Sequence, residues 1–254
     1  KRLLSLIPLV QPIAITSFTF IFSSYSAVYA NDYQTYFDSG FKKGEKGDYF
    51  GAIYDYTSSI ELNSNNKEAY YNRGWAKAQI NDHSGAISDY QAAINIDPSY
   101  EKALYGLGLS KSNLGNYYGS ISDYTQLINI NPDHENGYFG RAYSKSKISN
   151  SYGAISDYTQ VIKLNSNNDD AFYNRGLEKH NLNQYYEAIS DYSKAIEINK
   201  KYKKAFLNRS VSKSKIGDIK GACTDARKAK SLGYKSIKND NWIKENCNTS
   251  FKLF

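Results

Sequence analysis

Histidine and cysteine are scarce in this chain, with three His and two Cys among 254 residues. His83, His134 and His180 lie far apart in the sequence, without the close spacing that zinc ligands adopt. There is also no Gly-rich loop of the kind that cradles phosphate groups. The sequence therefore predicts no metal, no cofactor and no small-molecule substrate.

Proline is scarce as well, with four residues, which fits a soluble helical protein. What the chain has instead is a 34-residue period. The motif Gly-Ala-Ile-Tyr-Asp-Tyr at 51–56 recurs, with small changes, at 85–90, 119–124, 153–158, 187–192 and 221–226. Such a period indicates a stack of units that bury their apolar faces against one another. Stacks of this kind bind other molecules more often than they transform them.

Each repeat reads as a pair of antiparallel helices. Between Lys67 and Pro98, small and apolar residues recur at spacings of three and four on either side of a polar turn at 80–84. This pattern predicts two helices of about 12 to 14 residues each. Pro98 in the link to the next repeat cannot continue a helix and favours the start of a new one.

Two columns of small residues face a column of large rings. Gly inside a helix costs about 1 kcal/mol relative to Ala, so its recurrence requires close helix packing. The first column is Gly40, Gly74, Gly108, Ala142, Gly176 and Ser210, the second is Ala52, Ala86, Ser120, Ala154, Ala188 and Ala222, and the rings are Tyr56, Tyr90, Tyr124, Tyr158 and Tyr192.

In these columns, in repeat length and in linker residues Pro98 and Pro132, the chain resembles a tetratricopeptide repeat (TPR) protein of an exported, bacterial type. The resemblance implies an all-α, right-handed α-solenoid of about six repeats over 31–230, near 33–66, 67–100, 101–134, 135–168, 169–202 and 203–230, with a cap at 231–254. Ser64, Ser166 and Lys200 stand where the family often has Pro. The resemblance also implies a concave groove, lined by first helices, that binds a protein or peptide.

The groove-facing residues implied by the resemblance mix aromatic, aliphatic and amide side chains. Rings supply contact area and amides can pair with a peptide backbone, although some of these rings must pack between repeats instead. The predicted partner-binding residues are Tyr71, Asn72, Trp75, Tyr105, Leu109, Phe139, Tyr143, Tyr173, Asn174, Leu177 and Asn208, with Leu207 and Val211 in the same columns. A clamp for acidic chaperone tails is not expected, because Trp75 and Leu109 stand where that clamp needs Asn.

A Lys column and an Asp column run through all six repeats, from Lys43 and Asp55 to Lys213 and Asp225. They predict a ladder of ion pairs within the hairpins. The alternative is a row of anion-binding sites. The Ser144 to Lys147 and Ser212 to Lys215 strings match a hydrolase motif, but they lie in first helices of the Lys column, so the sequence predicts no enzyme.

The first thirty residues indicate export. Lys1 and Arg2 precede an apolar stretch at 3–22, and small residues ending in Ala30 precede polar Asn31. This pattern is typical of a signal peptide over 1–30, which would place the protein in a periplasm, a lumen or the extracellular space. An uncleaved membrane anchor is the alternative.

The two cysteines fit an oxidising compartment. Cys223 and Cys247 are expected to form a disulfide that ties the C-terminal segment to the last repeat. The alternative for Cys223 is a small buried thiol in a column otherwise occupied by Ile. The segment after Ser231 leaves the repeat motif, and Asp240 is expected to cap a short helix there.

Charge is uneven along the chain. Residues 31–199 have 15 basic and 21 acidic residues, net −6, whereas residues 200–254 have 15 and 4, net +11. This basic face could meet anionic lipids, an acidic polymer or protein, or a second copy; nucleic acid is not expected for an exported protein. A solvated end face is the alternative. Its residues are Lys200, Lys201, Lys203, Lys204, Lys213, Lys215, Arg227, Lys228 and Lys230.

The sequence therefore supports two functions. The main hypothesis is a non-enzymatic scaffold that binds a protein or peptide in the groove. The other is a structural tether whose basic C-terminal face binds a membrane surface or an acidic partner.

Overall fold

The structure, a computed structural model, describes residues 32–235 and 237–247, without the side chains of 237–239. The predicted signal peptide and the end of the chain lie outside these residues. The described part is helical and contains no strand. A helix at 32–45 precedes α2 (Tyr49–Leu62), α3 (Lys67–Gln79), α4 (His83–Ile96), α5 (Glu101–Asn113), α6 (Tyr117–Ile130), α7 (Glu135–Lys147), α8 (Ser151–Leu164), α9 (Asp169–Asn181), α10 (Tyr185–Ile198), α11 (Lys203–Lys215), α12 (Ile219–Ser231) and α13 (Ile237–Cys247).

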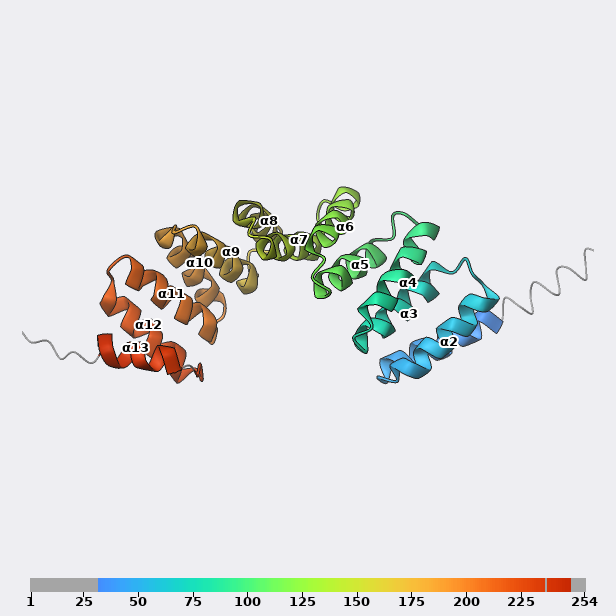
Figure 1. Ribbon diagram of the computed structural model, residues 1–254, viewed down its shortest axis with the longest axis horizontal. Helices are drawn as coiled ribbons and strands as arrows, with labels where there is room; N and C mark the ends of the chain where they lie inside the picture. Colours follow the sequence, from blue (N-terminus) through green and yellow to red (C-terminus); the bar gives the residue numbers. More distant parts are fainter. Residues whose placement is uncertain (1–31, 236, 248–254) are drawn as a thin grey trace, which may run out of the picture. The chain divides into compact units, whose positions relative to one another are not determined.

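The helices divide between two compact units. Unit 1 ends at Pro98 and contains α2, α3 and α4, which pack in that order. Unit 2 begins at Ser99 and contains α5 to α13, each packed against the next (Figure 1). Within unit 2, α5 also contacts α7, and α9 also contacts α11, so the first helices of successive repeats lie in one layer. The predicted all-α helical repeat solenoid is confirmed.

The turn inside each repeat explains where the second helix begins. In five turns an Asp or Asn side chain accepts a hydrogen bond from a Gly backbone N–H three residues later, which caps the helix; these caps are Asp48, Asp82, Asn116, Asn150 and Asp218. The residue before each cap has a positive φ, near +60° to +82°. Gly47, Gly115 and Gly217 adopt it without strain, but Ser149 adopts it at 61°.

The columns of small residues let the helices approach closely, as predicted. Ala52, Ala86, Ala154, Ala188 and Ala222 are fully buried. A Cβ atom on Gly74 would lie 3.0 Å from the ring of Tyr90, so a larger residue there would have to displace that ring. The Tyr column fills the remaining space, with exposed fractions of 3% or less. Desolvation by burial accordingly raises the pKa of Tyr56 to about 12.

The helix period continues beyond the sequence motif. α13 begins at Ile237, 34 residues after α11 begins at Lys203, so α13 occupies the position of the first helix of a seventh repeat. The prediction that Asp240 caps this helix is wrong, because the helix begins three residues earlier. Asp240 lies in the first turn instead and pairs with Lys230 at 3.0 Å. Among the described helices, none is long and apolar enough to cross a membrane.

Candidate partner-binding surface

The Lys and Asp columns form the predicted ladder. Each Lys in the column pairs with the Asp of its own hairpin at 2.7–2.9 Å, from Lys43 and Asp55 to Lys213 and Asp225. The Asp side chains are buried, with exposed fractions of 2–8%. This arrangement occupies every lysine of the column, and the alternative of a row of anion-binding sites is wrong.

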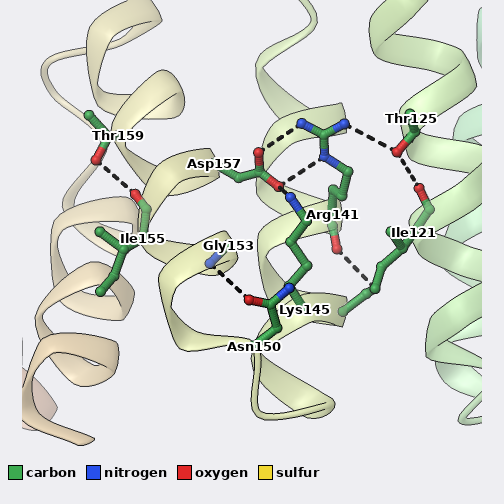
Figure 2. Close-up of polar contacts among 11 residues, drawn as sticks. Ile121, Thr125, Arg141, Lys145, Asn150, Gly153, Ile155, Asp157 and Thr159 are labelled. Atoms are coloured by element: carbon green, nitrogen blue, oxygen red, sulfur yellow. Dashed lines mark hydrogen bonds and ion pairs between the residues drawn. The ribbon is translucent and has the colours of Figure 1, made fainter. Parts of the chain in front are cut away.

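Arginine extends the ladder between repeats. Arg141 donates two hydrogen bonds to Asp157 and a third to Thr125 of the preceding repeat, at 3.1 Å, so one side chain joins α6, α7 and α8 (Figure 2). Arg73, Arg175 and Arg209 make the same paired bonds to Asp89, Asp191 and Asp225, and their third bonds go to Thr57, Thr159 and Ser193. In the third repeat Leu107 stands in the arginine position, and Asp123 keeps only Lys111. Burial raises the pKa of Asp123, although Lys111 opposes the shift.

The predicted partner-binding residues fall on both units. Tyr71, Asn72 and Trp75 lie on α3 of unit 1. The other eight lie on first helices of unit 2; within each helix they are three or four residues apart, except for the neighbours Tyr173 and Asn174, which places them on one side of each helix. We call this surface the first-helix face of unit 2; it contains Tyr105, Leu109, Phe139, Tyr143, Tyr173, Asn174, Leu177 and Asn208, together with Leu207 and Val211.

The first column of this face belongs largely to the core. The rings of Tyr105, Phe139 and Tyr173 pack against Tyr124, Tyr158 and Tyr192 of the second helices at 5.4–5.9 Å between ring centroids. Burial raises the pKa of the Tyr105 and Tyr173 hydroxyls. In unit 1, Tyr71 packs on Tyr90 in the same way, and Trp75 packs edge-on against Tyr49 at 5.6 Å. These rings therefore stabilise the fold as well as contributing surface.

The second column is the exposed part of the face. Leu109, Tyr143 and Val211 are 44%, 43% and 41% exposed, and Leu177 is half-buried between them. Tyr143 also has the Lys147 ammonium group over its ring, 5.0 Å from the centroid. These side chains have no partner helix in front of them among the described residues, and they form an apolar row along unit 2.

The amides of this face already have partners. Asn174 donates to the backbone carbonyl of Asp170 in its own helix, and Asn208 donates to the Tyr173 hydroxyl at 3.0 Å. Each of these bonds uses one of the two N–H groups of the amide, so the second N–H and the oxygen are the groups that an incoming peptide could use.

Sequence reasoning missed a buried polar cluster behind this face. Glu178 is 3% exposed and accepts hydrogen bonds from the hydroxyls of Ser146 and Ser151. Two residues further along α9, His180 Nδ1 lies 2.8 Å from the hydroxyl of Ser212. A signal was present in the sequence, since the column of Glu178 contains the small residues Ala76, Ser110, Ser144 and Ser212 in the other repeats, apart from Lys42 in the first.

The predicted basic face separates into paired and unpaired residues. Lys213 belongs to the ladder with Asp225, and Arg227 donates to the backbone carbonyl of Cys247. Lys230 pairs with Asp240 but keeps a side chain 56% exposed. The remaining residues are exposed and have no ion-pair partner in the described parts of the chain: Lys200, Lys201, Lys203, Lys204, Lys215 and Lys228.

Cys223 and Cys247 are joined by a disulfide in the structure, with their Cα atoms 5.5 Å apart. The bond connects the buried side of α12 to the last residue of α13. Ile243, 8% exposed, is the buried apolar residue of α13. The disulfide therefore fixes α13 over the last repeat, where it covers an apolar surface that would otherwise face solvent.

Comparisons with known proteins agree with this fold. Residues 101–134 and 169–202 match the tetratricopeptide repeat family, and residues 76–115 match the TPR repeat. No curated protein sequence matches the chain. Among solved structures, the MamA protein aligns with a TM-score of 0.65 at 24% identity, over 69% of this chain and 96% of that one.

Two further structures align over most of their own length. YrrB, described as a TPR protein with an unusual peptide-binding site, aligns with a TM-score of 0.65 at 20% identity, over 74% of this chain and 97% of that one. PilF of Pseudomonas aeruginosa aligns with a TM-score of 0.70 at 13% identity, over 85% and 99%. At these levels of sequence identity, the comparisons show that the chain shares the fold of these proteins.

Proposed function

Because the chain is a tetratricopeptide repeat protein, a fold whose members generally act as non-enzymatic protein–protein interaction scaffolds, we propose that it captures an extended peptide segment of a protein partner. The binding surface is the first-helix face of unit 2. The observation that carries this proposal is the exposed apolar row of Leu109, Tyr143 and Val211. Burying exposed apolar side chains against a partner is favourable, and Tyr is among the residue types that most often dominate the binding energy of a contact.

The polar surroundings of that row suit a peptide rather than a rigid partner surface. Asn174 and Asn208 lie on the same first helices as Leu177 and Val211, and an amide oxygen can accept a hydrogen bond from a peptide backbone N–H. YrrB, which has the same fold, is described as having a peptide-binding site. We also propose that the protein is exported, on the basis of the basic and apolar residues of 1–22.

The proposal is tested with a random peptide library displayed on phage and selected against residues 31–254. The selected peptides are then titrated against Leu109→Ala/Tyr143→Ala. The matched control is Tyr118→Ala/Tyr152→Ala, which removes two side chains 75% and 70% exposed on the second helices. We expect at least about a tenfold loss of affinity in the first variant and none in the control. Equal affinity for both variants would contradict the proposal.

Helical content is measured in parallel by circular dichroism, because the two variants remove exposed side chains and should both stay folded. Phe139→Ala serves as the contrasting change: it removes a ring that packs on Tyr158. We expect Phe139→Ala to lower the stability of unit 2, so a loss of binding in that variant alone would not support the proposal.

A second candidate function is a tether, in which the basic C-terminal face binds an anionic partner. The specific observation in its favour is the group of exposed lysines without ion-pair partners at the end of unit 2. The two functions respond differently to salt. Screening should weaken a contact made by lysines strongly and a contact made by the apolar row only modestly.

A further inference from the structure

The lysines at the end of unit 2 gather at one edge of the last repeat. α11 and α12 are joined by a short turn and pack side by side as an antiparallel pair. The start of α11 therefore lies beside the end of α12. This edge, which we call the lysine edge, brings together the side chains of Lys200, Lys201, Lys203, Lys204, Lys228, Lys230 and Lys235, all of them exposed.

The lysine edge has more positive than negative charge. Among the described residues, Lys230 is the member that has an ion-pair partner, Asp240. Two carboxylates at the start of α9 lie against the linker before α11, where Asn199 donates to Asp169 and Tyr202 donates to Asp170; these donors are neutral, so both carboxylates keep their charge. The seven lysines of the edge therefore outnumber the carboxylates near it, which are Asp240, Asp169, Asp170 and Glu197, the last lying within electrostatic reach of Lys200.

Two of these lysines stand where a helix disfavours them. The start of a helix has a partial positive charge, so acidic residues stabilise it and basic residues do not. The other first helices follow this rule, with Glu68, Glu101, Glu135 and Asp169 in their first turns. α11 has no acidic residue there and begins with Lys203 and Lys204. Helix stability therefore does not explain these two charges.

The chemistry of the edge favours a lipid surface over a folded protein. Protein interfaces have an aromatic or apolar centre and are depleted of Lys, whereas the lysine edge consists of Lys. Arg227, next to Lys228, already donates to the backbone carbonyl of Cys247, so the lysines are the groups of this edge that face solvent without a fork of fixed geometry. Clusters of four to eight basic residues are typical of contacts with anionic membranes, where each adds about 1 kcal/mol. Of the two interpretations of residues 1–30, the uncleaved anchor would also hold the chain at a membrane.

We propose that the lysine edge docks the last repeat onto an anionic lipid bilayer. This inference rests on the second candidate function and names its partner, and it is independent of the peptide proposal for the first-helix face. The bound state leaves the apolar row of Leu109, Tyr143 and Val211 available, because those residues lie at the middle of the first helices and the lysines lie at helix ends and linkers.

The test is co-sedimentation of residues 31–254 with vesicles of phosphatidylcholine and phosphatidylglycerol in a ratio of two to one, against vesicles of phosphatidylcholine alone. The key variant is Lys203→Glu/Lys204→Glu. The matched control is Lys42→Glu/Lys46→Glu, which makes the same charge change at exposed residues of the helix at 32–45. We expect binding to the anionic vesicles only, a loss of at least about thirtyfold in the key variant, and a smaller loss in the control.

Thermal unfolding of the same variants separates binding from folding. Lys203→Glu/Lys204→Glu places acidic residues at a helix start, so its unfolding temperature should equal or exceed that of the parent chain. Reduced vesicle binding with undiminished stability supports the proposal. Absence of binding to the anionic vesicles, or equal loss in both variants, overturns it.

A separate titration with an acidic polymer distinguishes failure of this inference from failure of the tether function. Polyglutamate is titrated against the same variants without vesicles. If polyglutamate binds through Lys203 and Lys204 and anionic vesicles do not bind, then the lysine edge has an acidic polymer as its partner and the lipid proposal is wrong. If neither binds, the tether function itself is wrong.

Discussion

Arg141 and Asp157 form a paired, two-bond contact between the helices of one repeat, with Arg141 Nε 2.9 Å from Asp157 Oδ2 and Nη2 2.8 Å from Oδ1. Asp157 is 3% exposed, and Lys145 reaches the same carboxylate at 2.7 Å (Figure 2). Two cations thus share one buried anion. Because Arg141 also donates to Thr125, the contact fixes the register of one repeat against the next.

The first prediction compares two buried carboxylates of the ladder. Asp157→Asn should destabilise unit 2 by about 3 kcal/mol, because it leaves Arg141 and Lys145 partly buried without their anion. Asp123→Asn should cost less than about 1 kcal/mol, since Asp123 has one cation and burial already disfavours its charge. Urea unfolding followed by circular dichroism measures both. Similar losses in the two variants would contradict the role assigned to Arg141.

The burial of Asp123 also makes the stability of the folded chain depend on pH. Its pKa in the folded chain is raised above the ordinary value of 3.8, mainly by burial. The folded state therefore holds the proton more tightly than the unfolded state does. The contribution of Asp123 to stability is largest at low pH and is lost as the pH rises from 3.8 through the raised value. Asp123→Asn removes that part of the pH dependence.

The ladder and the helix pairs could be predicted from sequence because each depends on a residue type that recurs in every repeat. Lys43 and Asp55 have counterparts in all six repeats, and close packing of two helices makes their pairing almost unavoidable. The hydrogen bond from Arg141 to Thr125 was not predicted. It crosses between repeats, and its acceptor column contains Thr57, Gln91, Thr125, Thr159 and Ser193, which looks like an ordinary polar surface.

The candidate site was predicted less completely, because helix periodicity gives the side of a helix but not what packs against it. Trp75 lies on the predicted side, yet its ring packs on Tyr49 in the neighbouring helix. Phe139 and Tyr143 are four residues apart, but only Tyr143 is exposed. The difference comes from Tyr158, whose ring covers Phe139. Such contacts join residues distant in sequence, so no local pattern reveals them.

A second prediction concerns the turns within the repeats. Ser149 adopts a φ of 61°, which costs a residue with a Cβ atom about 1–2 kcal/mol. Ser149→Gly should therefore stabilise unit 2 by about 0.5–1 kcal/mol, after the added chain entropy of Gly in the unfolded state is subtracted. The control is Ser156→Gly, the same substitution in the middle of α8, which should destabilise by about 1 kcal/mol. Shifts of the same sign in urea unfolding would contradict this account.

A third prediction concerns the disulfide. The bond closes a loop with a sequence separation of 24 residues, and loop entropy gives about 3.5 kcal/mol of stabilisation for this size. Cys247→Ser should lower the unfolding temperature of unit 2 and release α13 from α12. Dithiothreitol should have the same effect on the parent chain and no effect on the variant. An unfolding temperature of the parent chain that does not respond to dithiothreitol would contradict the prediction.

A fourth prediction concerns His180, whose ring lies between three helices. Its Nδ1 faces the hydroxyl of Ser212 on α11, and its ring packs edge-on against Tyr185 on α10, 5.2 Å between centroids. The Ser212 hydroxyl donates to the backbone carbonyl of Asn208, so the imidazole is the donor in their contact. Burial lowers the pKa of His180 below its ordinary value of 6.5, and the positive charge of Lys215 adds to the shift. The neutral ring is therefore the form that the fold accommodates.

The sign of the pH effect follows from that shift. Because the folded pKa is lower than the unfolded one, the unfolded chain binds the proton more tightly, and stability rises with pH across the interval between them. The contribution is complete above pH 6.5 and is lost as the pH falls through the folded value.

His180→Asn keeps an N–H group that can reach Ser212 but cannot titrate, so the loss of stability between neutral and mildly acidic pH should become smaller. Lys215→Gln should act in the same direction and less strongly, because it removes only the smaller cause. An unchanged pH profile in His180→Asn would show that the imidazole ionises as freely in the folded chain as in the unfolded one.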